Sequence, residues 1–355
     1  MKSRSLFASM FMMAAVLLLA GAATSSADGI TSPSGNLPKL DGIAYIAGHG
    51  GHLAVLNLAT GDLDRIVVGP AGGELEGKIA GLTLDAAHKT EGGGTHGAAM
   101  IGRTLYVGML NGHVKKVNLD DPDKKVTDLG QIGEKFCGAV PGPGGDVYYE
   151  DMANGNVYIF DPKSEKLADT LSVGKSVCGI GWDKGDKHGF VSDMVQGKVF
   201  VLDWKTKKIV NTIDNVGSFI HQARTNPADT ELWVTAANEF TVGPKGPVPA
   251  ATAGKGKSEL VIIDLKKQKI KDRIDLTDEG AFAHDLAFTP DGKYALVTAR
   301  TYADDSIMLY IDTKTHKILG SRSLCLACHD KMGVAVTIDN KSPLLCGITV
   351  DWSKK

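Results

Sequence analysis

Residues Cys137 to Leu171 read CGAVPGPGGDVYYEDMANGNVYIFDPKSEKLADTL, and Cys178 to Ile213 read CGIGWDKGDKHGFVSDMVQGKVFVLDWKTKKIVNTI. The two stretches align almost without gaps. Each contains a short strand, a turn, two apolar strands separated by a glycine turn, and a charged return strand. Four short antiparallel strands in roughly 42 residues are typical of one blade of a β-propeller.

The same unit recurs along the chain and includes both of its ends. Further copies begin at His96, His221 and His284. Residues 43–68 match the second, third and fourth strands of a blade, and residues 333–350 match a first and a second strand. We therefore predict an all-β fold: a single β-propeller domain over residues 28–355, with six or seven four-stranded blades and a ring closed by strands from both termini.

Two segments do not fit the repeat. Residues 69–94 separate the first blade from the second, and residues 239–258 interrupt the blade that starts at His221. The second insertion is rich in proline, glycine and alanine and has no apolar period. We expect it to be a long structureless loop, which is either functional or a tolerated surface insertion. A functional loop would cover a partner or a site.

The N-terminus predicts export. Lys2 and Arg4 precede an almost wholly apolar run from Leu6 to Ala23, and small residues follow it. This pattern is that of a cleaved secretory signal peptide over residues 1–27, and an uncleaved membrane anchor is the alternative. The rest of the chain has no apolar stretch of spanning length. We expect a periplasmic or otherwise exported protein with no membrane span after cleavage.

Composition excludes several classes of function. The chain has 39 basic and 41 acidic residues, scattered rather than clustered, so it has neither a nucleic-acid footprint nor a polybasic membrane patch. It lacks a G-x-S-x-G nucleophile elbow, a P-loop, a Rossmann fingerprint and an H-E-x-x-H motif. Five cysteines do not make a disulfide scaffold. The repeat and a few histidines and cysteines remain as the functional signals.

Every copy of the repeat opens with His or Cys just before its first strand. These residues are His96, Cys137, Cys178, His221 and His284, and His329 takes the sixth place if two residues are inserted. First strands line the channel of a propeller, so we expect the six side chains to meet at one channel mouth and to form a metal, haem or substrate site. The alternative is that each histidine forms a hydrogen bond within its blade and each cysteine is a small buried hydrophobe.

The remaining questions about cysteine follow from the same alignment. Cys137 and Cys178 occupy equivalent positions in adjacent blades, and a disulfide between them requires their Cα atoms to lie within about 7 Å. Cys346, in a buried strand, is expected to be an inert core thiol.

Near the C-terminus, Cys325, Cys328 and His329 stand in the spacing C-x-x-C-H. This spacing is that of covalent haem attachment, in which two thioethers hold the vinyl groups and the histidine binds the iron. A cytochrome c domain usually wraps helices around the haem after the motif, whereas the residues after His329 are predicted to form strands. A redox or metal dithiol and a structural role are the alternatives. A distal iron ligand would come from elsewhere, with His49, His52, His96 and His284 as candidates.

Three phrases carry a resemblance to known families: FTPDGKYALVTAR from Phe288, VYIFDPKSEKL from Val157 and LVIIDLKKQKI from Leu260. Nearly the whole mature chain resembles periplasmic YVTN-type propellers, which include the haem d1-binding domain of cytochrome cd1 nitrite reductase and the NirF-like proteins. That resemblance implies a haem held at a channel mouth by histidine, and the C-x-x-C-H motif departs from it. The chain also resembles propeller subunits of multi-haem nitrogen enzymes, such as the β subunit of hydrazine synthase, which implies partner subunits.

We therefore expect an exported propeller in periplasmic redox chemistry and nitrogen metabolism. It would be an electron-transfer or scaffold subunit of a haem oxidoreductase complex, with c-type haem on Cys325, Cys328 and His329 and with other subunits or a soluble electron carrier as partners. The alternative is a non-redox module that binds a metal ion or ligand through His96, His221, His284 and His329 together with Cys137 and Cys178. A haem enzyme in its own right is a third class, and it would need an open iron position.

Overall fold

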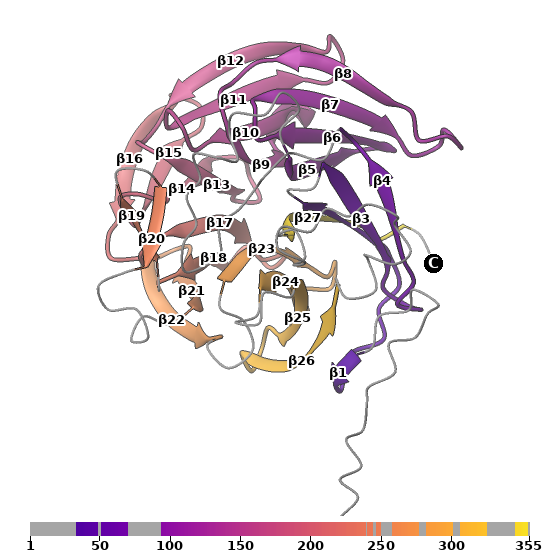
Figure 1. Ribbon diagram of the computed structural model, residues 1–355. Helices are drawn as coiled ribbons and strands as arrows, with labels where there is room; N and C mark the ends of the chain where they lie inside the picture. The colour runs from indigo at the N-terminus through magenta and orange to yellow at the C-terminus, as the bar shows by residue number, and fades with distance from the viewer. Residues whose placement is uncertain are drawn as a thin grey trace, which may run out of the picture.

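The six blades form a ring around a central channel (Figure 1). The structure is a computed structural model and describes residues 33–48, 51–69, 94–238, 240–243, 246–249, 258–276, 282–300, 306–324 and 345–353. Within these ranges the chain forms six antiparallel blades of four strands, each with one strand nearest the centre and one at the periphery, and a short N-terminal strand adds a fifth strand to the sheet of one blade. The prediction of an all-β propeller is confirmed, and the number of blades is six.

The strands of the first three blades are given from the innermost outward. Blade 1 consists of β27 (Leu345–Asp351), β2 (Ile43–Gly48), β3 (His52–Asn57) and β4 (Leu63–Val67). Blade 2 consists of β5 (Thr95–Ile101), β6 (Thr104–Met109), β7 (His113–Asn118) and β8 (Val126–Gln131). Blade 3 consists of β9 (Phe136–Pro141), β10 (Val147–Asp151), β11 (Asn156–Asp161) and β12 (Lys166–Ser172).

The other three blades follow the same order. Blade 4 consists of β13 (Val177–Trp182), β14 (His188–Asp193), β15 (Lys198–Asp203) and β16 (Lys208–Ile213). Blade 5 consists of β17 (Ile220–Thr225), β18 (Glu231–Ala237), β21 (Ser258–Asp264) and β22 (Lys269–Asp275). Blade 6 consists of β23 (Phe282–Phe288), β24 (Tyr294–Arg300), β25 (Ser306–Asp312) and β26 (Lys317–Ser323).

Both termini take part in closing the ring, as predicted. β27 pairs with β2, which makes the C-terminal strand the innermost strand of blade 1. The prediction that 333–350 supplies a first and then a second strand is wrong, because residues 345–351 are themselves the innermost strand; residues 325–344 lie outside the described residues. At the other terminus, β1 (Pro33–Gly35) pairs with the outer strand β26 of blade 6, which the sequence did not indicate.

Burial explains the pattern of each blade. In blade 3, β10 is buried along its whole length, whereas β12 is almost wholly exposed. The middle strands are apolar on both faces because they pack against two neighbouring blades, and the outer strand is charged because it forms an open edge. Apolar clusters fill the contacts between blades: Phe160 of blade 3 meets Tyr106 of blade 2 with ring centroids 5.9 Å apart. The main core therefore lies between the blades rather than within any one of them.

The insertion 239–258 is not structureless. It contains β19 (Phe240–Gly243) and β20 (Gly246–Pro249), which pair as an antiparallel hairpin. Pro247 and Pro249 are two residues apart, so their missing N–H groups fall on the same edge of β20 and leave the other edge free to pair. The insertion 69–94 lies almost entirely outside the described residues, as do residues 1–27. Within the described part of the chain there is no helix with the length and apolarity needed to cross a membrane.

Candidate functional site

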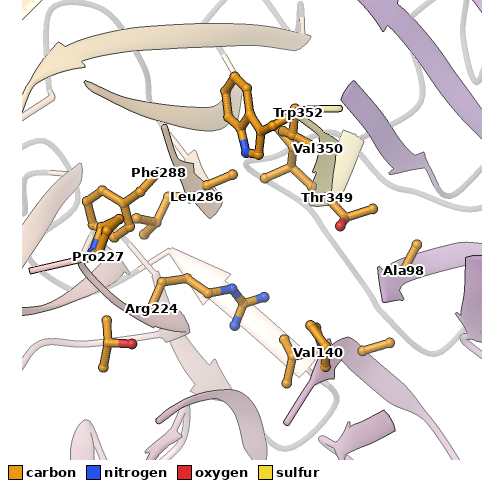
Figure 2. Close-up of a pocket in the computed structure, with 14 residues that line it drawn as sticks. Ala98, Val140, Arg224, Pro227, Leu286, Phe288, Thr349, Val350 and Trp352 are labelled. Atoms are coloured by element: carbon orange, nitrogen blue, oxygen red, sulfur yellow. The ribbon is translucent and has the colours of Figure 1, made fainter. Parts of the chain in front are cut away.

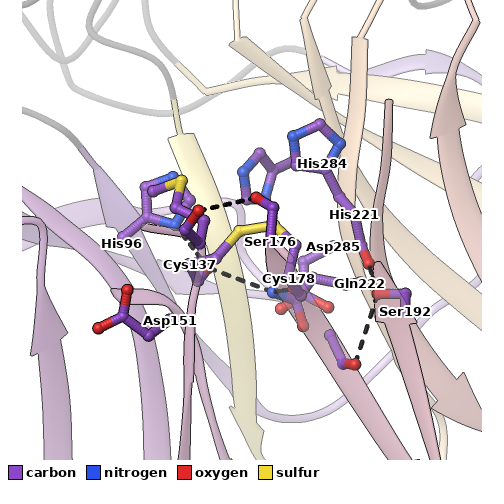
Figure 3. The surroundings of a disulfide bond; sticks show 12 residues. His96, Cys137, Asp151, Ser176, Cys178, Ser192, His221, Gln222, His284 and Asp285 are labelled. Carbon is purple, nitrogen blue, oxygen red and sulfur yellow. Dashed lines mark hydrogen bonds between the residues drawn. A yellow bond between two sulfur atoms is a disulfide. The ribbon is translucent and has the colours of Figure 1, made fainter. Parts of the chain in front are cut away.

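Each innermost strand carries His or Cys near its start. In blade order these six residues, which we call the ring, are Cys346, His96, Cys137, Cys178, His221 and His284. At this point the pairing of every innermost strand with its neighbour shifts, as in a β-bulge. A bulge re-aims the side chains at its position. Figure 3 shows five of the ring side chains converging on one another.

The ring is compact and buried. Cys137 and Cys178, of adjacent blades, form a disulfide with Cα atoms 5.0 Å apart. The imidazole of His284 meets those of His96 and His221, in each case with centroids 4.7 Å apart. One ligand atom each from His96, Cys137 and His284 lies within 4.8 Å of the other two. No ring residue is more than 4% exposed, so nitrogen and sulfur donors are gathered where water is largely excluded.

The sixth member of the ring is Cys346, which corrects the alignment that gave His329 this place. The triplet Leu345-Cys346-Gly347 in β27 repeats the pattern of Thr95-His96-Gly97 in β5. A signal was therefore present, because His or Cys followed by Gly recurs in four of the innermost strands. His329 lies outside the described residues together with Cys325 and Cys328, and its part in a site stays a prediction.

Glycine follows the ring residue where neighbouring blades approach closely. A Cβ atom on Gly97 would lie 2.5 Å from the backbone nitrogen of Ala139, and one on Gly179 would lie 2.6 Å from that of Ala223. No side chain fits at these positions. In blades 5 and 6 the same position holds Gln222 and Asp285, which lie immediately beneath the ring.

Polar side chains fix the backbone carbonyls of the ring. In three blades a hydroxyl on the second strand donates to the ring carbonyl of the next blade. The pairs are Ser192 Oγ to His221 O, Thr235 Oγ1 to His284 O (2.8 Å) and Thr298 Oγ1 to Cys346 O (2.6 Å). Gln222 Nε2 donates to the carbonyls of Cys137, at 3.2 Å, and of Cys178. These hydrogen bonds fix the backbone that carries the donor atoms of the ring.

The protonation of two ring histidines follows from their surroundings. His96 Nδ1 lies 2.5 Å from the carbonyl oxygen of Cys137. A carbonyl only accepts, so Nδ1 carries the proton and Nε2 keeps its lone pair. Burial, with a smaller contribution from His96, lowers the pKa of His221 to about 3. His221 is therefore neutral at ordinary pH, the form in which imidazole binds metals.

Glu150 replaces the hydroxyl residue in blade 3. It is fully buried on β10, at the position that Ser192, Thr235 and Thr298 hold in the next three blades. Burial raises the pKa of Glu150 from 4.5 to about 7, although the nearby Arg224 acts in the opposite direction. A neutral carboxyl group has an O–H donor, so protonated Glu150 can take the role of the three hydroxyl residues.

Asp285 is buried beneath the ring and forms an ion pair with Arg224, which is only partly buried. Arg224 Nη2 lies 3.0 Å from Asp285 Oδ2, which also accepts a hydrogen bond from the backbone N–H of Ile348 at 3.0 Å. Burial raises the pKa of Asp285, and Arg224 opposes that shift. The pair links β17, β23 and β27 across the channel, below the level of the ring.

The opposite mouth of the channel is an open cavity of about 310 Å³ (Figure 2). Its lining includes the apolar side chains of Phe288, Val350 and Trp352, but polar and apolar atoms share its surface about equally, and Arg224 extends into it. The guanidinium of Arg224 is already paired with Asp285. This mouth is therefore a cavity of mixed polarity whose one lining guanidinium is already paired, and the His and Cys residues of the ring lie at the other end.

The ring end is also where the chain makes its long excursions. Residues 68–94, 238–257 and 324–344 connect strand ends at the ring end, whereas the connections at the opposite end are short turns. Loops on a rigid scaffold are where binding and catalytic residues concentrate. Sequence reasoning missed Glu150, Gln222 and Asp285, because a buried polar layer built from three different blades leaves no local pattern.

These features define the chain as a six-bladed β-propeller with a buried His/Cys ring at one channel mouth. No protein-family model and no curated protein sequence matches it. Among solved structures, a hydrazine synthase chain from Kuenenia stuttgartiensis is similar in fold, with a TM-score of 0.52 and 20% sequence identity over 65% of this chain and 67% of that chain. The likeness concerns the propeller fold. The resemblance to YVTN-type and NirF-like proteins stays a prediction.

Proposed function

We propose that the chain is an exported propeller subunit of a periplasmic redox complex that handles nitrogen compounds, and that its working end is the ring end. The observation that carries this proposal is the buried His/Cys ring, with its inter-blade disulfide, at the end of the propeller where the strands joined by the long connections start and stop. Disulfides persist outside the cytoplasm, which agrees with export. The similarity in fold to a hydrazine synthase chain supports the nitrogen chemistry and the presence of partner subunits or an electron carrier.

The proposed cofactor is a c-type haem on Cys325, Cys328 and His329. The donor set fits this group, since it offers two thiols for thioether bonds and an adjacent imidazole for iron. The motif begins directly after Leu324, in the connection that enters β27 at the ring end. A bound haem supplies one-electron transfer, while the chain holds it covalently and orients it through His329.

The candidates for a second iron ligand differ in their surroundings. His96 and His284 are packed together inside the ring, at 4% and 1% exposed. His52 begins β3 at the same end of the propeller, and His49 lies outside the described residues. We infer that His52, itself 8% exposed, is the better candidate of the three described histidines, because His96 and His284 already pack against each other; the candidacy of His49 stays a prediction.

The haem proposal has a direct test. The protein is produced in a host with c-type haem maturation and given a denaturing pyridine haemochrome assay. One covalent haem per chain is expected, and Cys325→Ala and Cys328→Ala should each weaken or abolish attachment. Cys346→Ala is the control, since it removes a thiol outside the motif and should leave the haem in place. Wild-type protein without covalent haem refutes the assignment.

Export and partnership have separate tests. N-terminal sequencing of the mature protein should begin at Asp28, and a chain that still begins at Met1 contradicts cleavage. A tagged copy purified from native periplasm should bring stoichiometric haem-containing subunits with it. Purification as a lone chain contradicts the subunit role.

A second function is favoured by one observation, the approach of ligand atoms of His96, Cys137 and His284 to within 4.8 Å. In this role the chain is a non-redox module that binds a metal ion or a small ligand at the channel mouth. Metal analysis of wild type, His96→Ala and His284→Ala, each with the Cys137–Cys178 disulfide reduced, tests it. Loss of bound metal in both variants supports the module, and equal metal content in all three proteins refutes it.

A further inference from the structure

Cys137 belongs to two groups at once. Its sulfur is bonded to Cys178 of the adjacent blade. The same sulfur is one of the three ligand atoms that it shares with His96 and His284. Metals bind the thiolate form of cysteine, and a sulfur in a disulfide has no thiolate to offer. The two roles of Cys137 therefore exclude each other.

The donor set indicates the metal. Thiolate and imidazole are soft or intermediate ligands that suit copper, and a His2Cys set is a known copper arrangement. Calcium and magnesium are disfavoured because they take oxygen ligands. Two thioethers, of Met194 and Met152, belong to the same apolar cluster as Cys137 and Cys346. The surroundings of the three donors are thus rich in further sulfur.

The local hydrogen bonds prepare His96 for this role. Because Nδ1 donates to the carbonyl of Cys137, Nε2 is the unprotonated nitrogen of His96, which is the form of the atom that binds a metal ion. The carbonyl of His284 is held by Thr235 at 2.8 Å, which fixes the backbone of the second imidazole. Ligand atoms around a bound ion lie roughly 3.5 Å apart, so atoms within 4.8 Å of one another need to approach by about 1 Å. Cleavage of the disulfide frees the Cys137 side chain to make that movement.

We propose that His96, His284 and Cys137 bind one copper(I) ion when the Cys137–Cys178 disulfide is reduced, and that the disulfide closes the site when it forms. This inference rests on the second candidate function, the metal-binding module. A dithiol reductant supplies the two electrons and two protons: its own thiols become a disulfide, the Cys137–Cys178 bond breaks, and both cysteines become thiols. On binding copper(I), Cys137 releases its thiol proton to solvent.

The test is an anaerobic titration with copper(I) against a chromogenic copper(I) chelator. All proteins carry Cys325→Ala and Cys328→Ala, so that the C-x-x-C-H motif neither binds copper nor carries haem. Wild-type ring protein is compared before and after treatment with a dithiol and desalting. We expect one copper(I) per chain after reduction, and binding weaker by roughly a hundredfold or more before it. Cys178→Ser should bind without reductant, whereas Cys137→Ser should bind in neither state.

Further variants make each outcome decisive. His284→Gln keeps the disulfide pair and should lose binding, while His113→Gln, at a surface histidine 3.2 Å from Asp128, should not. Thermal unfolding of each variant identifies any that fail to fold. If the reduced protein and Cys178→Ser bind no more copper than Cys137→Ser, the copper(I) site is refuted, while the metal analysis of His96→Ala and His284→Ala decides the second candidate function separately. If the oxidised protein binds copper(I) as tightly as the reduced one, control of the site by the disulfide is refuted and the metal-binding function stands.

Discussion

Replacement of Glu150 by glutamine tests the polar layer beneath the ring. Glu150 is fully buried, and burial raises its pKa from 4.5 to about 7. Between these two values the folded chain keeps a proton that the unfolded chain releases. The free energy of unfolding of the wild type therefore falls as pH rises through this window. The contribution of Glu150 to it is fully present below pH 4.5 and is lost above about pH 7. Glutamine keeps the size of the side chain and cannot ionise.

The expected effect follows from the pKa difference. A difference of about 2.5 corresponds to roughly 3 kcal/mol, because one pKa unit is about 1.4 kcal/mol. The free energy of unfolding of Glu150→Gln, minus that of the wild type, should therefore rise by about 3 kcal/mol between pH 4.5 and about pH 8. Urea denaturation at several pH values, with the disulfide intact, measures it. The subtraction cancels the common contribution of His221, whose pKa is lowered to about 3.

The control is Glu134→Gln, because Glu134 is exposed. Its difference from the wild type should stay flat across the same range. If the difference for Glu150→Gln is also flat, the reasoning is refuted: Glu150 would then be ionised in the folded protein and balanced by Arg224 rather than neutral.

Three further substitutions test the packing and charge of the channel, each by denaturant unfolding. Gly97→Ala should lower the free energy of unfolding by about 1–3 kcal/mol, because its Cβ would meet the backbone of blade 3. Gly185→Ala, with open space around it, should leave the free energy of unfolding nearly unchanged. Equal effects of the two substitutions would contradict the close approach of blades 2 and 3. Arg224→Ala should lower the free energy of unfolding by about 3–5 kcal/mol, because it leaves Asp285 buried without its partner. Lys293→Ala, in an exposed pair with Asp291, should lower it by less than about 1 kcal/mol. A similarly small loss in both variants would show that Asp285 is not charged. Trp233→Ala removes a fully buried side chain and should lower the free energy of unfolding by about 3–5 kcal/mol. Val210→Ala, at an exposed side chain, should leave it almost unchanged. A small loss for Trp233→Ala would mean that blades 5 and 6 move together to fill the cavity left by the indole.

The fold was largely predictable because every blade of a propeller has the same order of strands and turns. Turn residues and apolar strands recur in every copy, so the stretch from Cys137 and the stretch from Cys178 predict each other. The prediction failed in blade 1, because the strand that begins at Leu345 was expected to be a second strand and is the innermost one. The ring was found in five of its six positions for the same reason, since equivalent positions face the same channel. Glu150 and Gln222 were not found, because they meet only after separate blades have packed together.

The innermost strand of blade 1 follows all the other described strands in sequence, and it carries Cys346. During synthesis and export, the ring can therefore be complete only after residues 345–351 have emerged. Cys137 and Cys178 meet the other strands of their own blades much earlier, and they are separated by only 41 residues. The disulfide can thus form while the channel still lacks one wall. The order of the strands therefore allows these cysteines to be oxidised before β27 encloses the site.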